Sequence, residues 1–121
     1  MVQLSKTFLY IALAMMISLC GHAFAQSDSP TIVGGYSVAD IASPEVISAV
    51  KFAITAKNAL PHMRPTKLVS IKTAQSQVVA GTNYKACLVV RQKAKTFTIS
   101  TTVYRDLSGV MRLTEWTKAR C

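Results

Sequence analysis

The chain has 121 residues, enough for one domain, and its 14 basic and five acidic residues give a net charge of +9. The acidic residues are scattered, and no Cys or His residues have the spacing of a metal site, so we expect no cofactor, no metal and no catalytic centre. His62 is the only histidine outside the first 25 residues, and we interpret it as a surface side chain in a loop rather than as a base.

The first 25 residues are typical of a cleaved signal peptide. Lys6 gives the positive start, residues 7–19 form an apolar run, and Ala23-Phe24-Ala25 places small residues at the two positions that a signal peptidase reads. The apolar run is shorter than the roughly 20 residues of a membrane span. We therefore expect cleavage before Gln26 and export, either to a periplasm or as a fully secreted protein, with no stable membrane anchor on the mature chain.

The expected mature chain keeps 13 basic and five acidic residues and so a net charge of +8. Residues 26–31 are polar and are interpreted as a flexible leader, and residues 32–121 are expected to form the folded domain. Ser43 is placed to cap a helix that starts with Pro44 and Glu45. Its apolar stripe is expected to comprise Val46, Ile47, Val50, Ala53 and Ile54, and Pro61 ends the helix because it pushes the preceding residue out of the α region.

After the helix the apolar period changes from 3.6 to 2, which predicts strands. We expect strands over residues 68–75, 84–91, 96–104 and 110–117, joined by hairpin connections at 77–81, 92–95 and 105–109. A helix followed by consecutive hairpins predicts an α+β domain, in which one helix packs on one face of a four- to five-stranded antiparallel sheet.

Three short motifs, taken together and in this order, resemble the cystatin superfamily. They are Ile32-Val33-Gly34-Gly35 before the helix, Gln77-Val78-Val79-Ala80-Gly81 with Thr82-Asn83-Tyr84 in the central hairpin, and Leu107-Ser108-Gly109 in the last hairpin. The sequence is most similar to the stefins, the single-domain and disulfide-free branch, here in a bacterial-style exported form. The last hairpin departs from the pattern, because many cystatins carry Pro-Trp there and stefins carry a Leu-Pro-Gly-like turn.

The resemblance implies a cystatin-like fold and a reversible, tight-binding inhibitor of papain-like and cathepsin-like cysteine proteases, not an enzyme. In such an inhibitor the N-terminal trunk and two hairpin tips enter the protease cleft as one wedge. Gly34 would turn the backbone away from the catalytic cysteine, so that no peptide bond is offered for attack. The protease-binding residues that the resemblance implies are Ile32, Val33, Gly34, Gln77, Val78, Val79, Ala80, Gly81, Leu107 and Ser108.

Other interpretations stay open, because each motif alone is also typical of an ordinary turn or edge strand. The basic excess fits a non-inhibitory cystatin-fold module that binds an acidic partner or an anionic surface polymer. Nucleic acid is not an expected partner, since no aromatic residues interleave the basic ones around Arg91, Lys93 and Lys95. We expect a monomer, and exchange of the first strand and helix through an opened central hairpin would give a dimer instead.

Cys87 and Cys121 are the two cysteines of the expected mature chain. An even number of cysteines in an exported chain permits a disulfide. The strand predicted over residues 96–104 separates the two sites, so a bond requires the tail to reach across it and bring the α-carbons within about 7 Å. The sequence leaves this disulfide undecided, because stefins lack it and other cystatins place their cysteines differently.

Overall fold

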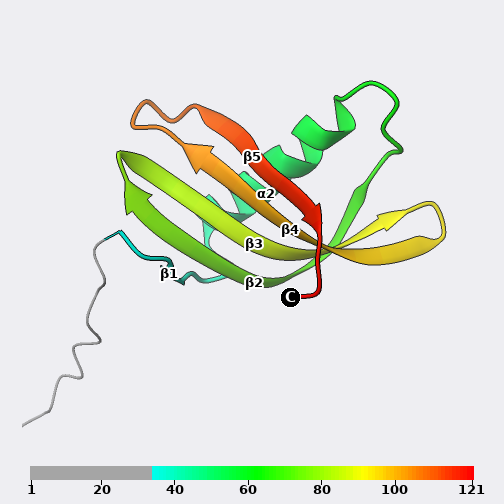
Figure 1. Ribbon diagram of the computed structural model, residues 1–121, viewed down its shortest axis with the longest axis horizontal. Helices are drawn as coiled ribbons and strands as arrows, with labels where there is room; N and C mark the ends of the chain where they lie inside the picture. The colour runs from blue at the N-terminus through cyan, green and yellow to red at the C-terminus, as the bar shows by residue number, and fades with distance from the viewer. Residues whose placement is uncertain (1–33) are drawn as a thin grey trace, which may run out of the picture.

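The computed structural model describes residues 34–121, so the expected signal peptide, the leader, Ile32 and Val33 lie outside the described residues. Its elements in chain order are β1 (Ser37–Val38), α2 (Pro44–Asn58), β2 (Lys67–Val79), β3 (Gly81–Gln92), β4 (Lys95–Arg105) and β5 (Met111–Lys118). The strands form one five-stranded antiparallel sheet in sequence order, and α2 lies across one face of it (Figure 1). The predicted α+β architecture is confirmed.

Helix α2 begins where the sequence predicts. The Ser43 hydroxyl accepts a hydrogen bond of 3.3 Å from the Val46 N–H, and Pro44 stands in the first turn, where a missing N–H costs nothing. The fully buried residues are Val46, Ala49, Val50 and Ala53. Ile47, expected on the apolar stripe, is only half-buried, and the smaller Ala49 occupies the contact with the sheet.

The core lies between α2 and strands β3 and β4. Leu88, Val90 and Ile99 are almost completely buried and pack with Val46 and Val50 of the helix. The predicted alternation along β3 therefore holds, with the even-numbered residues directed at the helix. Each such side chain contributes about 1.5–3 kcal/mol by leaving water.

The central hairpin is tighter than the sequence predicts. Residues 77–79, expected in a connection, continue strand β2, and the pairing runs as far as Val79 opposite Gly81. Only Ala80 remains between the two strands. The β-branched Val78 and Val79 suit the extended backbone, and Gly81, at φ +107°, makes the reversal.

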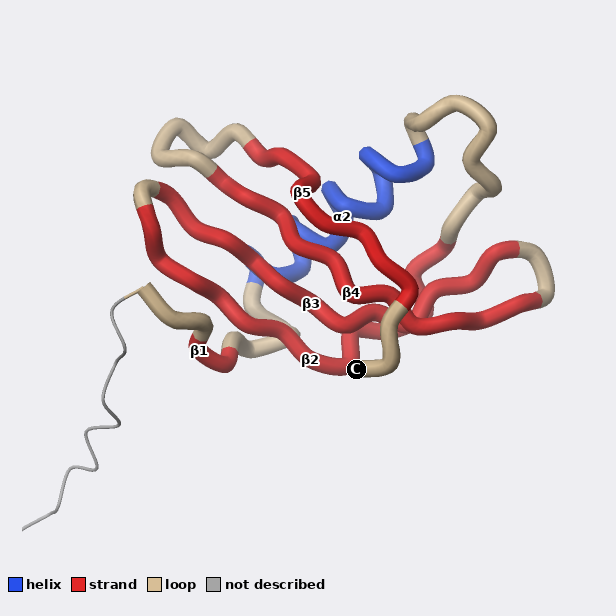
Figure 2. Tube along the Cα trace, viewed as in Figure 1, coloured by secondary structure: helices blue, strands red, loops and turns tan. Residues whose placement is uncertain are grey.

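Cys87 and Cys121 form a disulfide with α-carbons 6.0 Å apart. Strand β4 does separate β3 from β5, and the tail after β5 runs back across the sheet toward β2 (Figure 2). The Ala119 N–H donates to the Thr98 carbonyl, and Lys72 Nζ of β2 donates to the Cys121 carbonyl over 3.2 Å. The tail thus covers the sheet face opposite α2, which explains why Cys87 is buried there.

Within residues 34–121, no helix has both the length and the apolar character needed to cross a membrane.

Candidate functional site

Three segments that are distant in sequence lie at one end of the sheet. They are the chain around Gly34 and Gly35, the β2–β3 turn at Ala80, and the β4–β5 turn over residues 106–110 (Figure 1). Strand register brings them together, because β1 pairs with the last residues of β2 and Thr82 of β3 lies opposite Arg105 of β4. Gly34, the motif at 77–81 and the residues Leu107 and Ser108 are thus gathered at the same end.

Gln77 fastens the first segment to the central hairpin. Its Nε2 donates a hydrogen bond of 2.5 Å to the Gly34 carbonyl, and its Oε1 accepts one of 2.9 Å from Asn83 Nδ2. Gln77 and Asn83 are direct partners across β2 and β3. Asn83 therefore orients the amide of Gln77, and that amide holds the backbone of Gly34, which has φ +89°.

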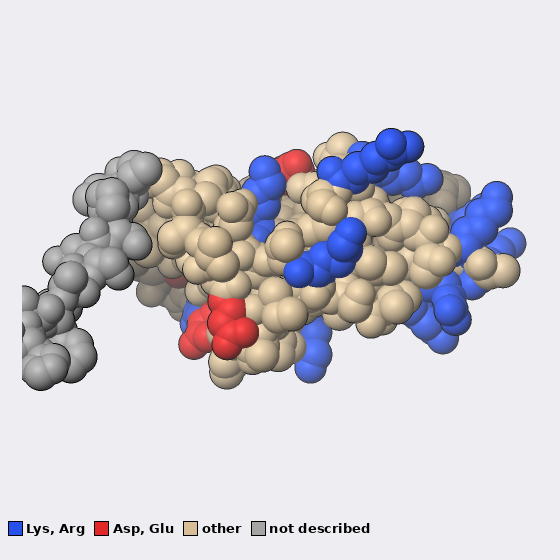
Figure 3. All heavy atoms as spheres, turned by 90° about the horizontal axis from the view of Figure 1, so that it is seen from below, with Lys and Arg blue, Asp and Glu red and all other residues tan. Residues whose placement is uncertain are grey.

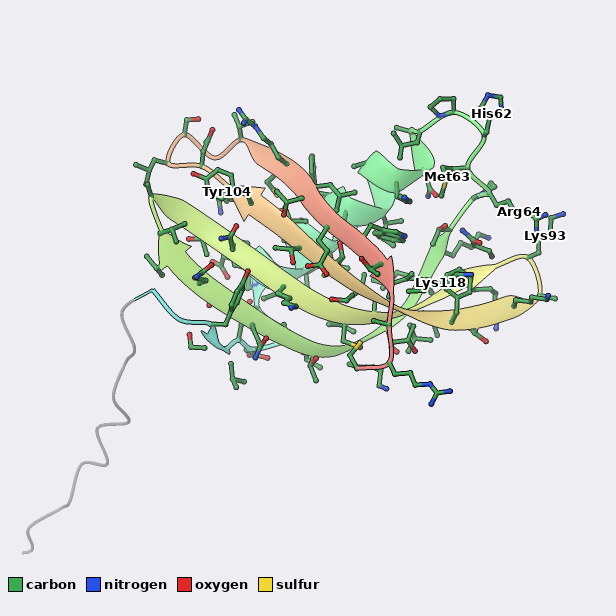
Figure 4. The ribbon with its side chains drawn as sticks, viewed as in Figure 1. His62, Met63, Arg64, Lys93, Tyr104 and Lys118 are labelled. Carbon is green, nitrogen blue, oxygen red and sulfur yellow. A yellow bond between two sulfur atoms is a disulfide. The ribbon has the colours of Figure 1, made fainter. Side chains whose placement is uncertain are left out.

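The β2–β3 turn presents an apolar surface on a fixed backbone. Val78 is 73% exposed and Val79 is 44% exposed, although both sit in a regular strand pair. The Tyr104 hydroxyl of β4 donates to the Ala80 carbonyl at the tip, and Figure 4 shows Tyr104 lying beside this turn. Exposed valines held in this way can bind an apolar surface with little loss of conformational entropy.

The β4–β5 turn is organised by one carboxylate. Asp106 Oδ1 accepts hydrogen bonds from the Ser108 hydroxyl (2.7 Å), the Ser108 N–H (2.9 Å) and the Val110 N–H (2.9 Å). These bonds, that of the Ser108 hydroxyl first, hold the pKa of Asp106 below its ordinary value. Ser108 therefore serves the turn itself, while Leu107 between them is 86% exposed and points into solvent.

The two turns border a shallow groove. Val78, Val79 and Gly81 line one side of it, and Leu107 and Gly109 line the other. Sequence reasoning missed the residues that hold this end in shape, Asn83, Tyr104 and Asp106. Two of them had a signal in the sequence, because Asp106 begins a turn and Asn83 belongs to the motif that continues after Gly81. No local pattern marked Tyr104 as a partner of Ala80.

The surface at this end consists mainly of apolar side chains and backbone. Among residues 34–121 there is no group of three or more His, Cys, Asp or Glu side chains that could hold a metal ion. The polar groups at the two turns mostly bond to the turns themselves, and what remains for a partner is apolar side chains and backbone. Such a surface fits a complementary apolar cleft.

The chain belongs to the cystatin family, because the family model of the cystatin domain matches residues 34–119. The members of this family are inhibitors of cysteine proteases and not enzymes. The stefin-like character stays a prediction, and the disulfide departs from that branch's pattern.

Two solved structures share the fold. The first, described as Al-CPI, is 20% identical over 71% of this chain and 100% of that chain, with a TM-score of 0.57. The second is a salivary cystatin from the soft tick Ornithodoros moubata, 16% identical over 72% of this chain and 98% of that chain, with a TM-score of 0.60. No curated protein was found to match the sequence significantly.

Proposed function

We propose that this protein is a reversible, tight-binding inhibitor of papain-like cysteine proteases and acts by inserting one end of its sheet into the active-site cleft. The observation that carries the proposal is the gathering of three segments at that end, each with exposed apolar side chains or a glycine backbone. Leu107 and Val78 are the most exposed of these apolar side chains, at 86% and 73%. A soluble domain rarely exposes such residues together unless they meet a partner.

Each segment has a distinct part in the proposed wedge. Ile32 and Val33 would fill the apolar pockets on the non-primed side of the cleft, and Gly34 would let the backbone turn away from the catalytic cysteine. Val78, Val79 and Ala80 would touch the cleft walls without burying unpaired polar groups. Leu107 would cover the primed side, and the bonds of Gln77, Ala80 and Ser108 within the inhibitor would keep the wedge in shape before it docks.

We also propose that the inhibitor is exported as a monomer. Residues 1–25 would be removed as a signal peptide, residues 26–31 would form a leader, and residues 32–121 the cystatin-like domain. The Cys87–Cys121 disulfide supports export, since such bonds persist in oxidising compartments. The salivary origin of the tick cystatin with the same fold is in keeping with this proposal.

Titration of active papain and of a cathepsin L-like enzyme with the purified protein tests the proposal. We expect stoichiometric inhibition by the intact chain, and weaker inhibition by a variant with Gly34→Glu and the residues before it deleted. Leu107→Ala should also weaken inhibition, whereas Val69→Ala should not, because Val69 is 51% exposed but lies near the other end of β2. A folded intact protein that left both enzymes untouched at micromolar concentration would rule out this function.

A further inference from the structure

Six basic side chains gather at the end of the molecule opposite the proposed wedge. They come from the segment before β2, the start of β2, the end of β3, the β3–β4 turn, the start of β4 and the end of β5. Figures 3 and 4 show this end rich in Lys and Arg. The segment before β2 is fixed to the end of β3, because Gln92 Nε2 donates to Thr66 Oγ1 over 2.8 Å. The basic end consists of Arg64, Lys67, Arg91, Lys93, Lys95 and Lys118.

No carboxylate of the described chain belongs to the segments that form the basic end. Asp40 lies in the turn before α2, Glu45 is in the first turn of α2, and Asp106 is in the β4–β5 turn. Glu115 lies opposite Thr102 and accepts a hydrogen bond from its hydroxyl. Two of the cations are themselves direct partners, because Lys67 of β2 pairs with Arg91 of β3. Like charges directly opposite each other destabilise a sheet, so the free protein carries a repulsion that an anionic ligand would relieve.

The cations surround the β3–β4 hairpin instead of covering one face of it. Arg91 and its partner Lys67 point away from α2, because the neighbouring Val90 is buried against the helix. Lys118 lies on the helix side, with its Nζ 4.6 Å from the centre of the Phe97 ring, and Lys93 is in the turn itself. A flat anionic surface reaches only one of these sides at a time, whereas a flexible linear polyanion reaches all of them.

Aromatic surface at this end is already occupied. Phe97 packs against the core and has the Lys118 ammonium group over its ring. Binders of single-stranded nucleic acid need free aromatic rings on which bases stack, and neither the β3–β4 turn of Lys93 and Ala94 nor the adjoining Lys95 supplies one. A polyanion without bases therefore fits better, and sulfate groups match the bidentate geometry of arginine.

We propose that the basic end binds a linear sulfated polysaccharide, independently of protease inhibition. The two sites lie at opposite ends of the same sheet, so the protein would bind the polymer and a protease at the same time.

Heparin serves as the probe, with its affinity for the purified full chain measured by calorimetry over a series of salt concentrations. The test variant is Lys67→Gln, Arg91→Gln, Lys93→Gln, and the control is Lys51→Gln, Lys85→Gln, Arg112→Gln, with the same loss of charge.

We expect the test variant to bind heparin at least about tenfold more weakly. The slope of log K against log salt concentration should fall by about three, because each of the three lost contacts no longer releases a counterion. The control should change the affinity by less than about threefold, as expected for distant charges screened by salt. Chemically desulfated heparin, oligo-dT and vesicles of anionic lipid should all bind more weakly than heparin.

Three results would overturn the proposal. Equal weakening by the two variants would assign the binding to net charge, and equal or tighter binding of desulfated heparin, oligo-dT or vesicles would assign it to another ligand. Absence of heparin binding at 0.15 M salt would rule out the proposed polysaccharide site. Urea unfolding checks the fold of each variant. Lys93→Gln with Lys95→Gln repeats the test at the exposed tip of the β3–β4 hairpin, without changing the Lys67–Arg91 pair.

Discussion

Gly81 stands where the backbone itself excludes other residues. It has φ +107°, and a Cβ built there would lie 2.4 Å from the Arg105 carbonyl oxygen. That oxygen belongs to the main chain of β4 and cannot rotate away, so the pairing of β3 with β4 would have to shift. The sequence motif Gln-x-Val-x-Gly therefore has a structural reason for its last residue, whatever the partner.

We expect Gly81→Ala to lower the free energy of unfolding by about 2–3 kcal/mol, through backbone strain and displacement of β4. Gly34→Ala is the matched control, because Gly34 also has a positive φ but a Cβ there meets nothing within 4 Å. Urea denaturation of the two variants compares them directly. A loss in Gly34→Ala as large as that in Gly81→Ala would contradict this account.

The role of the Gln77 amide in holding Gly34 can be tested by replacing the amide with a carboxylate of the same shape. In Gln77→Glu the carboxylate still accepts from Asn83, but it repels the Gly34 carbonyl to which the amide donates. We expect a changed chemical shift of the Gly35 amide, which adjoins the Gly34 carbonyl, and about fivefold weaker protease binding, which corresponds to a loss of about 1 kcal/mol. Gln75→Glu, an exposed change on the same strand, should alter neither measurement.

At the scale of elements, the β4–β5 hairpin depends on the charge of Asp106. Its folded-state pKa is lowered from 3.8 by the Ser108 hydroxyl and the Val110 N–H, so its contribution to stability is complete above 3.8. That contribution is lost as the pH falls through the lowered folded pKa. The turn that presents Leu107 should therefore stay intact across the mildly acidic range in which many proteases act.

NMR titration of the Ser108 and Val110 amides between pH 6 and pH 2 tests this dependence. We expect one transition with its midpoint below 3.8, the ordinary value for aspartate, and its disappearance in Asp106→Asn. A midpoint at or above 3.8 would show that the hydrogen bonds to the carboxylate do not favour its charged form.

For the whole molecule, the Cys87–Cys121 disulfide closes a loop with a sequence separation of 34 residues. Loop-closure entropy then predicts a stabilisation of about 3–4 kcal/mol, which Cys121→Ser should remove. Thermal unfolding with and without reductant measures it, and the reductant should have no effect on Cys121→Ser. Protease inhibition should not change, because the bond joins the middle of β3 to the tail and not to the wedge.

Local signals in the sequence were sufficient for most of the fold. Ser43-Pro44-Glu45 marked the helix start through capping chemistry, and the alternation of Ala86, Leu88 and Val90 gave the buried face of β3. The candidate site was indicated only by resemblance, since Gln77 and Gly34 are 43 residues apart. The crossing of the tail depends on contacts such as Lys72 with Cys121, 49 residues apart, for which no local pattern exists.

The position of the disulfide also bears on how two copies could interlock. All of the covalent loop lies after Ala80, in β3, β4, β5 and the tail, so opening the central hairpin at Ala80 breaks no crosslink. Two chains can therefore exchange β1, α2 and β2 by domain swapping while β3, β4, β5 and the tail of each chain stay crosslinked. The disulfide by itself therefore does not prevent two copies from exchanging these elements. The monomer instead depends on a closed central hairpin, which Gly81 allows by its positive φ and which the hydrogen bond from the Tyr104 hydroxyl to the Ala80 carbonyl holds.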